Sequence, residues 1–145
     1  MRPAKELTVL TYRKMRGVTL LELMIVVVIL GILTAIAYPS YRQLIERAKR
    51  TEARALLLRI AVDQERFYLQ NNTFGDMADL QYDEPQITDS DAYSVTITAN
   101  TASNFSATAT YQLGGEEADK CLTFTIDGRG TKTSGPYTDC WTRRQ

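Results

Sequence analysis

A single carboxylate stands inside the longest apolar stretch of the chain, and its position needs a chemical explanation. Residues 18–38 are mainly Leu, Ile and Val, and Glu22 is the one charged residue among them. A charge at the centre of a membrane-spanning helix costs roughly 2.5–3.5 kcal/mol, and less near the end of the helix. A carboxylate kept there predicts a positively charged partner, which the stretch itself does not supply.

The apolar stretch is long enough to cross a membrane. At about 1.5 Å per residue, a helix over residues 18–38 would extend roughly 30 Å, the thickness of a hydrocarbon core. Five basic residues precede it, against the single acid Glu6: Arg2, Lys5, Arg13, Lys14 and Arg16. The positive-inside bias would keep this end in the cytoplasm and place the rest of the chain on the opposite side.

Two ordinary explanations of this stretch stay open. A secretory signal peptide ends in a small-residue cleavage site, and the sequence AIAYPS at residues 35–40 has that character. A plain signal anchor needs only the apolar length. Neither of them explains Glu22.

The residues around Glu22 resemble the processing site of type IV prepilins. Arg16-Gly17-Val18-Thr19-Leu20-Leu21-Glu22 follows a basic leader and opens the apolar stretch, as in that family. The resemblance implies that a dedicated prepilin peptidase cuts between Gly17 and Val18 and then methylates the amine of Val18. The first mature residue departs from the commonest family pattern, in which it is phenylalanine, and the leader is long for the type IVa branch.

The resemblance also supplies the missing cation. Cleavage would create an amine on Val18, four residues before Glu22 and on the same helix face. In the family this pair forms between neighbouring subunits as one of them leaves the membrane for a filament, so Glu22 is the expected assembly carboxylate. Gly31 and Pro39 punctuate the helix. Pro39 either marks the membrane boundary or, as the family implies, lets the segment from Gly31 loosen during packing.

The helix is expected to continue outside the membrane. Residues 40–70 contain neither glycine nor proline, so a single helix of about 50 residues is predicted, from Thr19 to about Leu69. One apolar face is spaced in steps of four and three residues: Leu44, Ala48, Thr51, Ala55, Leu58 and Val62. A second apolar sector contains Ile45, Leu56, Ile60 and Phe67. One face would cover the protein's own sheet and another would meet neighbouring subunits, while the basic residues, Arg50 included, would lie on a solvated surface.

The remaining chain predicts an antiparallel sheet of about four strands. Apolar and polar residues alternate over 93–99, 105–113 and 122–126, and a weaker strand is expected near 131–133. The predicted fold class is therefore α+β, with a long helix packed on the sheet, as in pilins. The expected organisation is a leader at 1–17, a transmembrane and assembly helix at 18–39, and a globular domain at 40–145.

The two cysteines are expected to form a disulfide in the exported chain. Cys121 and Cys140 would then close a C-terminal loop, which in pilins lies on the subunit surface; two unpaired thiols are the alternative. Asp139-Cys140-Trp141 and the stretch from Gln64 to Tyr68 resemble the PilE-type minor pilins of type IVa systems.

Several classes of function are disfavoured. The chain has no histidine, no nucleophile elbow and no phosphate-binding loop, so we expect neither an enzyme nor a cofactor. After residue 17 it holds 12 basic and 16 acidic residues, which argues against nucleic acid. Six acids within residues 76–91 fit no EF-hand pattern, so a solvated loop is favoured over a calcium site and no metal ligand is assigned.

The sequence therefore predicts a structural minor pilin that supports pilus biogenesis, twitching motility or adhesion. A major pilin and a pseudopilin of a type II secretion system are the alternatives. Expected partners are other major and minor pilin subunits, the prepilin peptidase and the inner-membrane assembly machinery. The precursor would lie in the inner membrane with a periplasmic domain, and the mature chain in the pilus.

Overall fold

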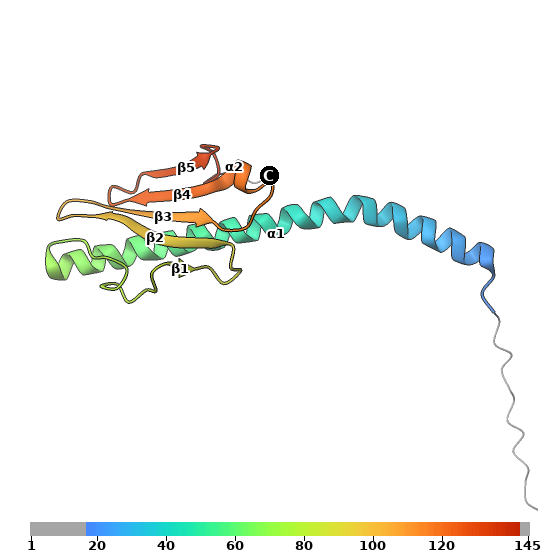
Figure 1. Cartoon of the computed structure of the whole chain (residues 1–145), viewed down its shortest axis with the longest axis horizontal. Helices are drawn as coiled ribbons and strands as arrows, with labels where there is room; N and C mark the ends of the chain where they lie inside the picture. The colour runs from blue at the N-terminus through green and yellow to red at the C-terminus, as the bar shows by residue number, and fades with distance from the viewer. Residues whose placement is uncertain (1–16, 143–145) are drawn as a thin grey trace, which may run out of the picture. The chain divides into compact units, whose positions relative to one another are not determined.

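The computed structural model describes residues 17–142 (Figure 1). Apart from Gly17, the predicted leader lies outside the described residues. The chain separates into two units that meet between Tyr38 and Pro39, and each is described by itself below.

The first helix, α1, spans Leu20–Asn71 and contains 52 residues. It confirms the single long helix predicted from the sequence, and Pro39 lies within it. Between Leu20 and Tyr38 every residue is exposed in the structure. The apolar surface of this part of α1 is therefore left uncovered by residues 17–142.

The second unit places the rest of α1 on a five-stranded sheet (Figure 1). The strands follow chain order in space and each pairs antiparallel with the next. They are β1 (Gln86–Ile87), β2 (Tyr93–Asn100), β3 (Phe105–Tyr111), β4 (Leu122–Asp127) and β5 (Lys132–Pro136), with the short helix α2 (Ala118–Cys121) before β4. The strand that the sequence did not predict is β1, which is too short to show an alternating pattern.

The core lies between α1 and one face of the sheet. Every second residue of β3 is buried, beginning with Phe105, and Val95, Ala109 and Phe124 lie side by side across three strands. Ala53, Leu57 and Ile60 of α1 belong to the same buried cluster. The alternate residues on one face of the strands therefore pack against a row of apolar residues on α1, which is the usual basis of a two-layer α+β domain.

The sequence left open which of the two apolar sectors of α1 covers the sheet. The sector that contains Leu44 is exposed, with 61% of Leu44, 42% of Leu58 and 55% of Val62 accessible, whereas Ile60 of the second sector is buried. The complete buried row is Arg50, Ala53, Leu57, Ile60 and Gln64. Apolar periodicity did not predict the whole row, because it begins and ends with polar residues.

Two strand assignments also need correction. Ala99 was expected on the buried side of its strand, but the register shifts between Ile97 and Ala99 and leaves Ala99 exposed. A bulge of this kind adds a residue and reverses the facing of those that follow. Leu113 was expected to continue the next strand, but β3 ends at Tyr111 and Leu113 is exposed.

Candidate processing and assembly site

The start of α1 is capped by a threonine. The backbone N–H of Glu22 donates to Oγ1 of Thr19 at 3.2 Å, and Leu23 N–H donates to the Thr19 carbonyl. This satisfies donors that the first turn of a helix otherwise leaves free. In the predicted processing motif, Thr19 has the place of a small residue and no role as a helix cap. Threonine followed three residues later by glutamate was the available signal, because that spacing is typical of a capping box.

Glu22 lies in the first turn of α1, and its carboxylate is exposed. A negative charge at this end of a helix interacts favourably with the helix dipole. Among residues 17–142, no cation forms an ion pair with Glu22. The start of α1 therefore carries an exposed acidic group that has no ion pair among the described residues.

Gly17 and Val18 directly precede the capped turn. Val18 is exposed, and a Cβ placed on Gly17 would have no atom within 4 Å apart from those of its chain neighbours. The fold of the described residues thus sets no steric requirement for glycine at position 17.

Length and composition allow α1 to cross a membrane. Its most apolar window of 18 residues has a mean hydropathy of 2.8, and none of that window is buried by the rest of the structure. Gly31 lies in this part of α1, with open space around its Cα. The helix remains continuous through Gly31 and Pro39, so the proposed loosening of that segment stays a prediction.

The exposed face of α1 in the second unit carries an apolar stripe. We define the outer stripe as Leu44, Ala48, Thr51, Ala55, Leu58 and Val62, all of which are exposed. These residues recur at alternating steps of four and three, the spacing of a helix–helix seam. Ala48, Thr51 and Ala55 are small, so a second helix could approach closely at the middle of the outer stripe.

The C-terminal segment is closed by a disulfide. Cys121 and Cys140 are bonded, with their Cα atoms 5.8 Å apart, which confirms the predicted pairing. Both cysteines are buried. The ring of Trp141 packs edge-on against Phe124, with centroids 5.6 Å apart, and its Nε1–H donates to the Thr133 carbonyl at 2.7 Å. The bond therefore holds the chain end against β4 and β5.

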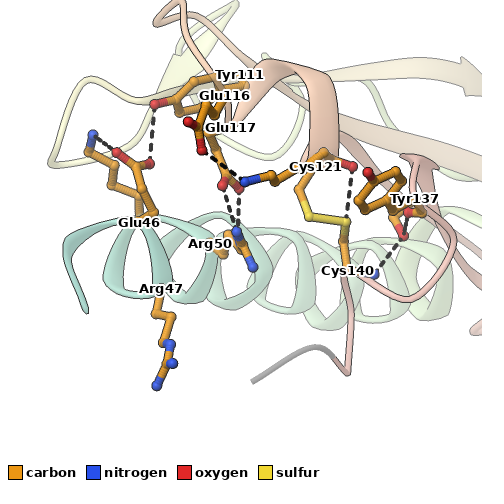
Figure 2. A network of polar contacts seen from close by, with 12 residues as sticks. Glu46, Arg47, Arg50, Tyr111, Glu116, Glu117, Cys121, Tyr137 and Cys140 are labelled. Atoms are coloured by element: carbon orange, nitrogen blue, oxygen red, sulfur yellow. Dashed lines mark hydrogen bonds and ion pairs between the residues drawn. A yellow bond between two sulfur atoms is a disulfide. The ribbon is translucent and has the colours of Figure 1, made fainter. Parts of the chain in front are cut away.

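Two arginines of α1 contact the chain on either side of this disulfide. Arg50 donates from Nε and Nη2 to the two carboxylate oxygens of Glu117, which precedes Cys121 (Figure 2). This hydrogen bonding raises the pKa of Arg50. Arg54 Nη1 donates to the Trp141 carbonyl at 2.6 Å, and burial lowers the pKa of Arg54.

The expectation that these basic residues are solvated was therefore wrong for Arg50. Its side chain and that of Glu117 are only 6% and 5% exposed. In Figure 2, the neighbouring Arg47 extends away from the sheet, whereas Arg50 reaches toward Glu117. The signal that could have identified Arg50 is its place in the row with Ala53 and Leu57.

The acidic loop uses some of its carboxylates to hold its own backbone. Asp79 N–H donates to Oδ1 of Asp76 at 2.8 Å, and Asp76 N–H donates to Oδ2 of Asp79 at 3.0 Å. Within residues 17–142, no cluster of three or more acidic or cysteine side chains is placed to hold a metal ion. Turn formation accounts for these two acids without a bound ion.

Two separate parts of the chain match known protein families. Residues 39–125 match the family described as "Type IV minor pilin ComP, DNA uptake sequence receptor". Residues 12–38 match the prokaryotic N-terminal methylation motif. The second match contains the Gly17–Val18 bond and Glu22.

Relatives with curated names are fimbrial proteins. The chain is 36% identical over 121 residues to the type IV major fimbrial protein FimA of Dichelobacter nodosus, covering 80% of this chain and 69% of FimA. It is 43% identical over 63 residues to the type IV major pilin PilA of Myxococcus xanthus, a match that covers 43% of this chain and 29% of PilA. Among solved structures, the non-core minor pilin PilV of Neisseria meningitidis is 24% identical with a TM-score of 0.48, over 63% of this chain and 87% of PilV.

Proposed function

Because this chain belongs to the type IV pilin family, we propose that it is a minor pilin that is built into a type IV pilus. In this proposal, a prepilin peptidase removes residues 1–17 and methylates the amine of Val18. The precursor lies in the inner membrane with its leader in the cytoplasm and its second unit in the periplasm. The inner-membrane assembly machinery then transfers the mature subunit to a filament of major and minor pilins.

The observation that carries this proposal is the uncovered apolar surface of α1. Residues 18–38 present almost only apolar side chains, and the outer stripe adds Leu44, Leu58 and Val62 farther along the same helix. Apolar surface of this extent marks contact with lipid or with another protein. A membrane covers the first part before assembly, and neighbouring pilin helices cover both parts afterwards.

The start of α1 supports the processing step. The Thr19 cap makes a defined helix begin at Leu20, two residues after Val18, so a new amine on Val18 would stand near the positive end of the helix dipole. An amine is poorly placed there within its own helix, and the Glu22 carboxylate of a neighbour would offset its charge. This favours pairing between subunits and gives Glu22 a use that membrane insertion alone does not.

The proposal is tested by replacing Gly17 with phenylalanine. Since a Cβ at position 17 has no described atom within 4 Å apart from its chain neighbours, the variant should fold normally yet escape the peptidase. We expect it to remain in the membrane as the full-length precursor and to be absent from sheared pili. Gly31→Ala is the matched control for processing alone, because a Cβ at Gly31 also meets nothing within 4 Å and the residue lies away from the cleaved bond. Normal processing of Gly17→Phe would contradict the proposal.

The place of the subunit among pilins is a finer part of the proposal. Pseudopilins typically lack a C-terminal disulfide loop, so the Cys121–Cys140 bond favours a pilin. A minor pilin should form a small fraction of the protein in purified pili. An amount close to that of the main subunit would instead identify it as the major pilin.

DNA binding is a second candidate, favoured by the printed description of the ComP family. The charge distribution argues against it, since residues 39–145 hold 12 basic and 15 acidic residues. Of the basic residues on α1, Arg50 and Arg54 are already engaged by Glu117 and Trp141. We expect no salt-dependent binding of duplex DNA in fluorescence anisotropy, and tight binding that weakens with salt would favour the second candidate.

A further inference from the structure

The row of α1 that covers the sheet is polar at both ends and apolar between them. Arg50 lies at one end and Gln64 at the other, with Ala53, Leu57 and Ile60 between them. Apolar contact is not directional, so these three residues would tolerate a rotation or slip of α1 along the sheet. Hydrogen bonds require defined distances and angles, so the two polar ends of the row would not tolerate such a rotation or slip.

At the first end, Arg50 and Glu117 form a buried ion pair between α1 and the residue just before α2 (Figure 2). It is the only ion pair of the described residues in which both side chains are almost completely buried. Replacing both members of such a pair with apolar residues is often neutral or stabilising, whereas removing one of them is costly. The best-attested use of a buried polar pair is to specify register.

At the second end, Gln64 pairs with the backbone of Gly75. Its Nε2 donates to the Gly75 carbonyl at 2.7 Å, and its Oε1 accepts from the Gly75 N–H at 2.9 Å. Both residues are buried. Gln64 lies 14 residues after Arg50, about 21 Å along a helix at 1.5 Å per residue. The two ends are thus fixed by separate polar contacts that meet different parts of the domain.

Other polar contacts of α1 lie at its margins and are only partly buried. Arg54 donates to the Trp141 carbonyl, Glu52 accepts from the Ser90 N–H at 3.1 Å, and Tyr82 O–H donates to Asp63 at 2.6 Å. Water can replace hydrogen bonds at such positions, whereas an unpaired group in the buried row has no substitute. The two buried ends therefore dominate the choice of register.

We propose that Arg50 and Glu117 are positioning residues that fix the register of α1 on the sheet, and with it the face of α1 offered to neighbouring subunits. The second part of this statement rests on the function proposed above. The buried row and the outer stripe lie on different faces of one helix, so any rotation that displaces Arg50 also displaces Leu58 and Val62. An ion pair that contributes little to stability would in this way decide how the subunit packs.

The Gly75 amide provides a distant reporter of register. Its N–H is bonded to a side chain of α1 at the end opposite to Arg50. The experiment uses the mature chain, residues 18–145, in detergent micelles. The double variant Arg50→Met with Glu117→Leu should keep the thermal unfolding midpoint of the wild type. The Gly75 amide should exchange faster by on the order of tenfold, because Gln64 alone must then hold α1 in register and its bond to Gly75 opens more often.

Three controls make this experiment decisive. Arg50→Lys keeps the charge but loses the planar fork, so its Gly75 exchange should lie between wild type and the double variant. Arg59→Met removes an exposed cation from the same helix and should change neither reading. The proposal would be overturned if the Gly75 amide of the double variant exchanged as slowly as in the wild type. It would also be overturned if the thermal midpoint of the double variant were lower, because the ion pair would then act by stabilising the fold.

The consequence for assembly is measured separately as the fraction of subunit recovered in sheared pili. The double variant should be processed normally but recovered in pili at a lower fraction than wild type. Equal recovery would overturn the link between register and packing. If the wild-type chain itself is absent from pili, the proposed function fails, whereas the Gly75 measurement still decides the register of α1.

Discussion

At the scale of single residues, Glu22 and its surroundings determine how α1 begins. The helix cap uses the backbone N–H of Glu22 and the hydroxyl of Thr19, so it does not depend on the carboxylate. The carboxylate itself is exposed in the first turn. A substitution of the Glu22 side chain can therefore remove the negative charge without removing the hydrogen bond that caps the helix.

Replacing Glu22 tests the role of its charge. Glu22→Ala and Glu22→Gln should leave the helix cap, membrane insertion and cleavage intact, but should lower the ratio of subunit in sheared pili to subunit in membranes. Glu22→Asp should lower it less, because a shorter carboxylate must reach the same amine. If the carboxylate affected only insertion, Glu22→Ala would be harmless, since it removes a charge from the bilayer. A normal ratio for both Ala and Gln would remove the pairing argument.

At the scale of elements, the disulfide and α1 hold the C-terminal segment from two sides. Cys121 and Cys140 enclose β4 and β5, and Arg54 contacts the Trp141 carbonyl beyond the second cysteine. Residues 137–142 contain no helix, so their order depends on these tethers and on the packing of Trp141 against Phe124.

Removing the disulfide should therefore destabilise the domain. The variant with both Cys121→Ser and Cys140→Ser should lose about 2–4 kcal/mol of unfolding free energy, because the unfolded chain is no longer constrained. Limited proteolysis should then cut within residues 133–142 before it cuts β3. Wild-type protein treated with a dithiol reductant is the matched comparison. Equal denaturation midpoints for the variant and the oxidised wild type would show that the bond does not support the fold.

The elements that the sequence predicts correctly are those with uninterrupted patterns. The alternation that begins at Phe105 predicts β3, and the run without glycine or proline over residues 40–70 predicts the second part of α1 and its end. The complete sheet-facing row of α1 was not predicted because Arg50 and Gln64 look solvated until their partners are known. Glu117 lies 67 residues from Arg50, so no local pattern connects them.

The candidate site shows the same division. Gly17, Val18 and Glu22 are recognisable because their motif is local, and the pairing of two cysteines leaves a single choice. The positioning role of Arg50 depends on a tertiary contact and becomes visible only in the folded domain. Local motifs therefore predicted the processing chemistry, but not the contacts that orient α1.

At the scale of the whole molecule, the chain combines a helix that is suited to lipid with a domain that is suited to water. The first unit leaves its apolar side chains uncovered, and the second has its own core and disulfide. In the proposed function, a membrane covers this helix before assembly and neighbouring pilin helices cover it afterwards. Conversion between these two environments is the central claim of the proposed function.

Intact-mass analysis of the protein from sheared pili, compared with protein from membranes, tests this claim most directly. The account predicts that the chain from pili begins at Val18, carries one added methyl group on its amine and retains the bond between Cys121 and Cys140. A chain that begins at Met1 or after Ala37, or a protein found in membranes and absent from pili, would contradict it.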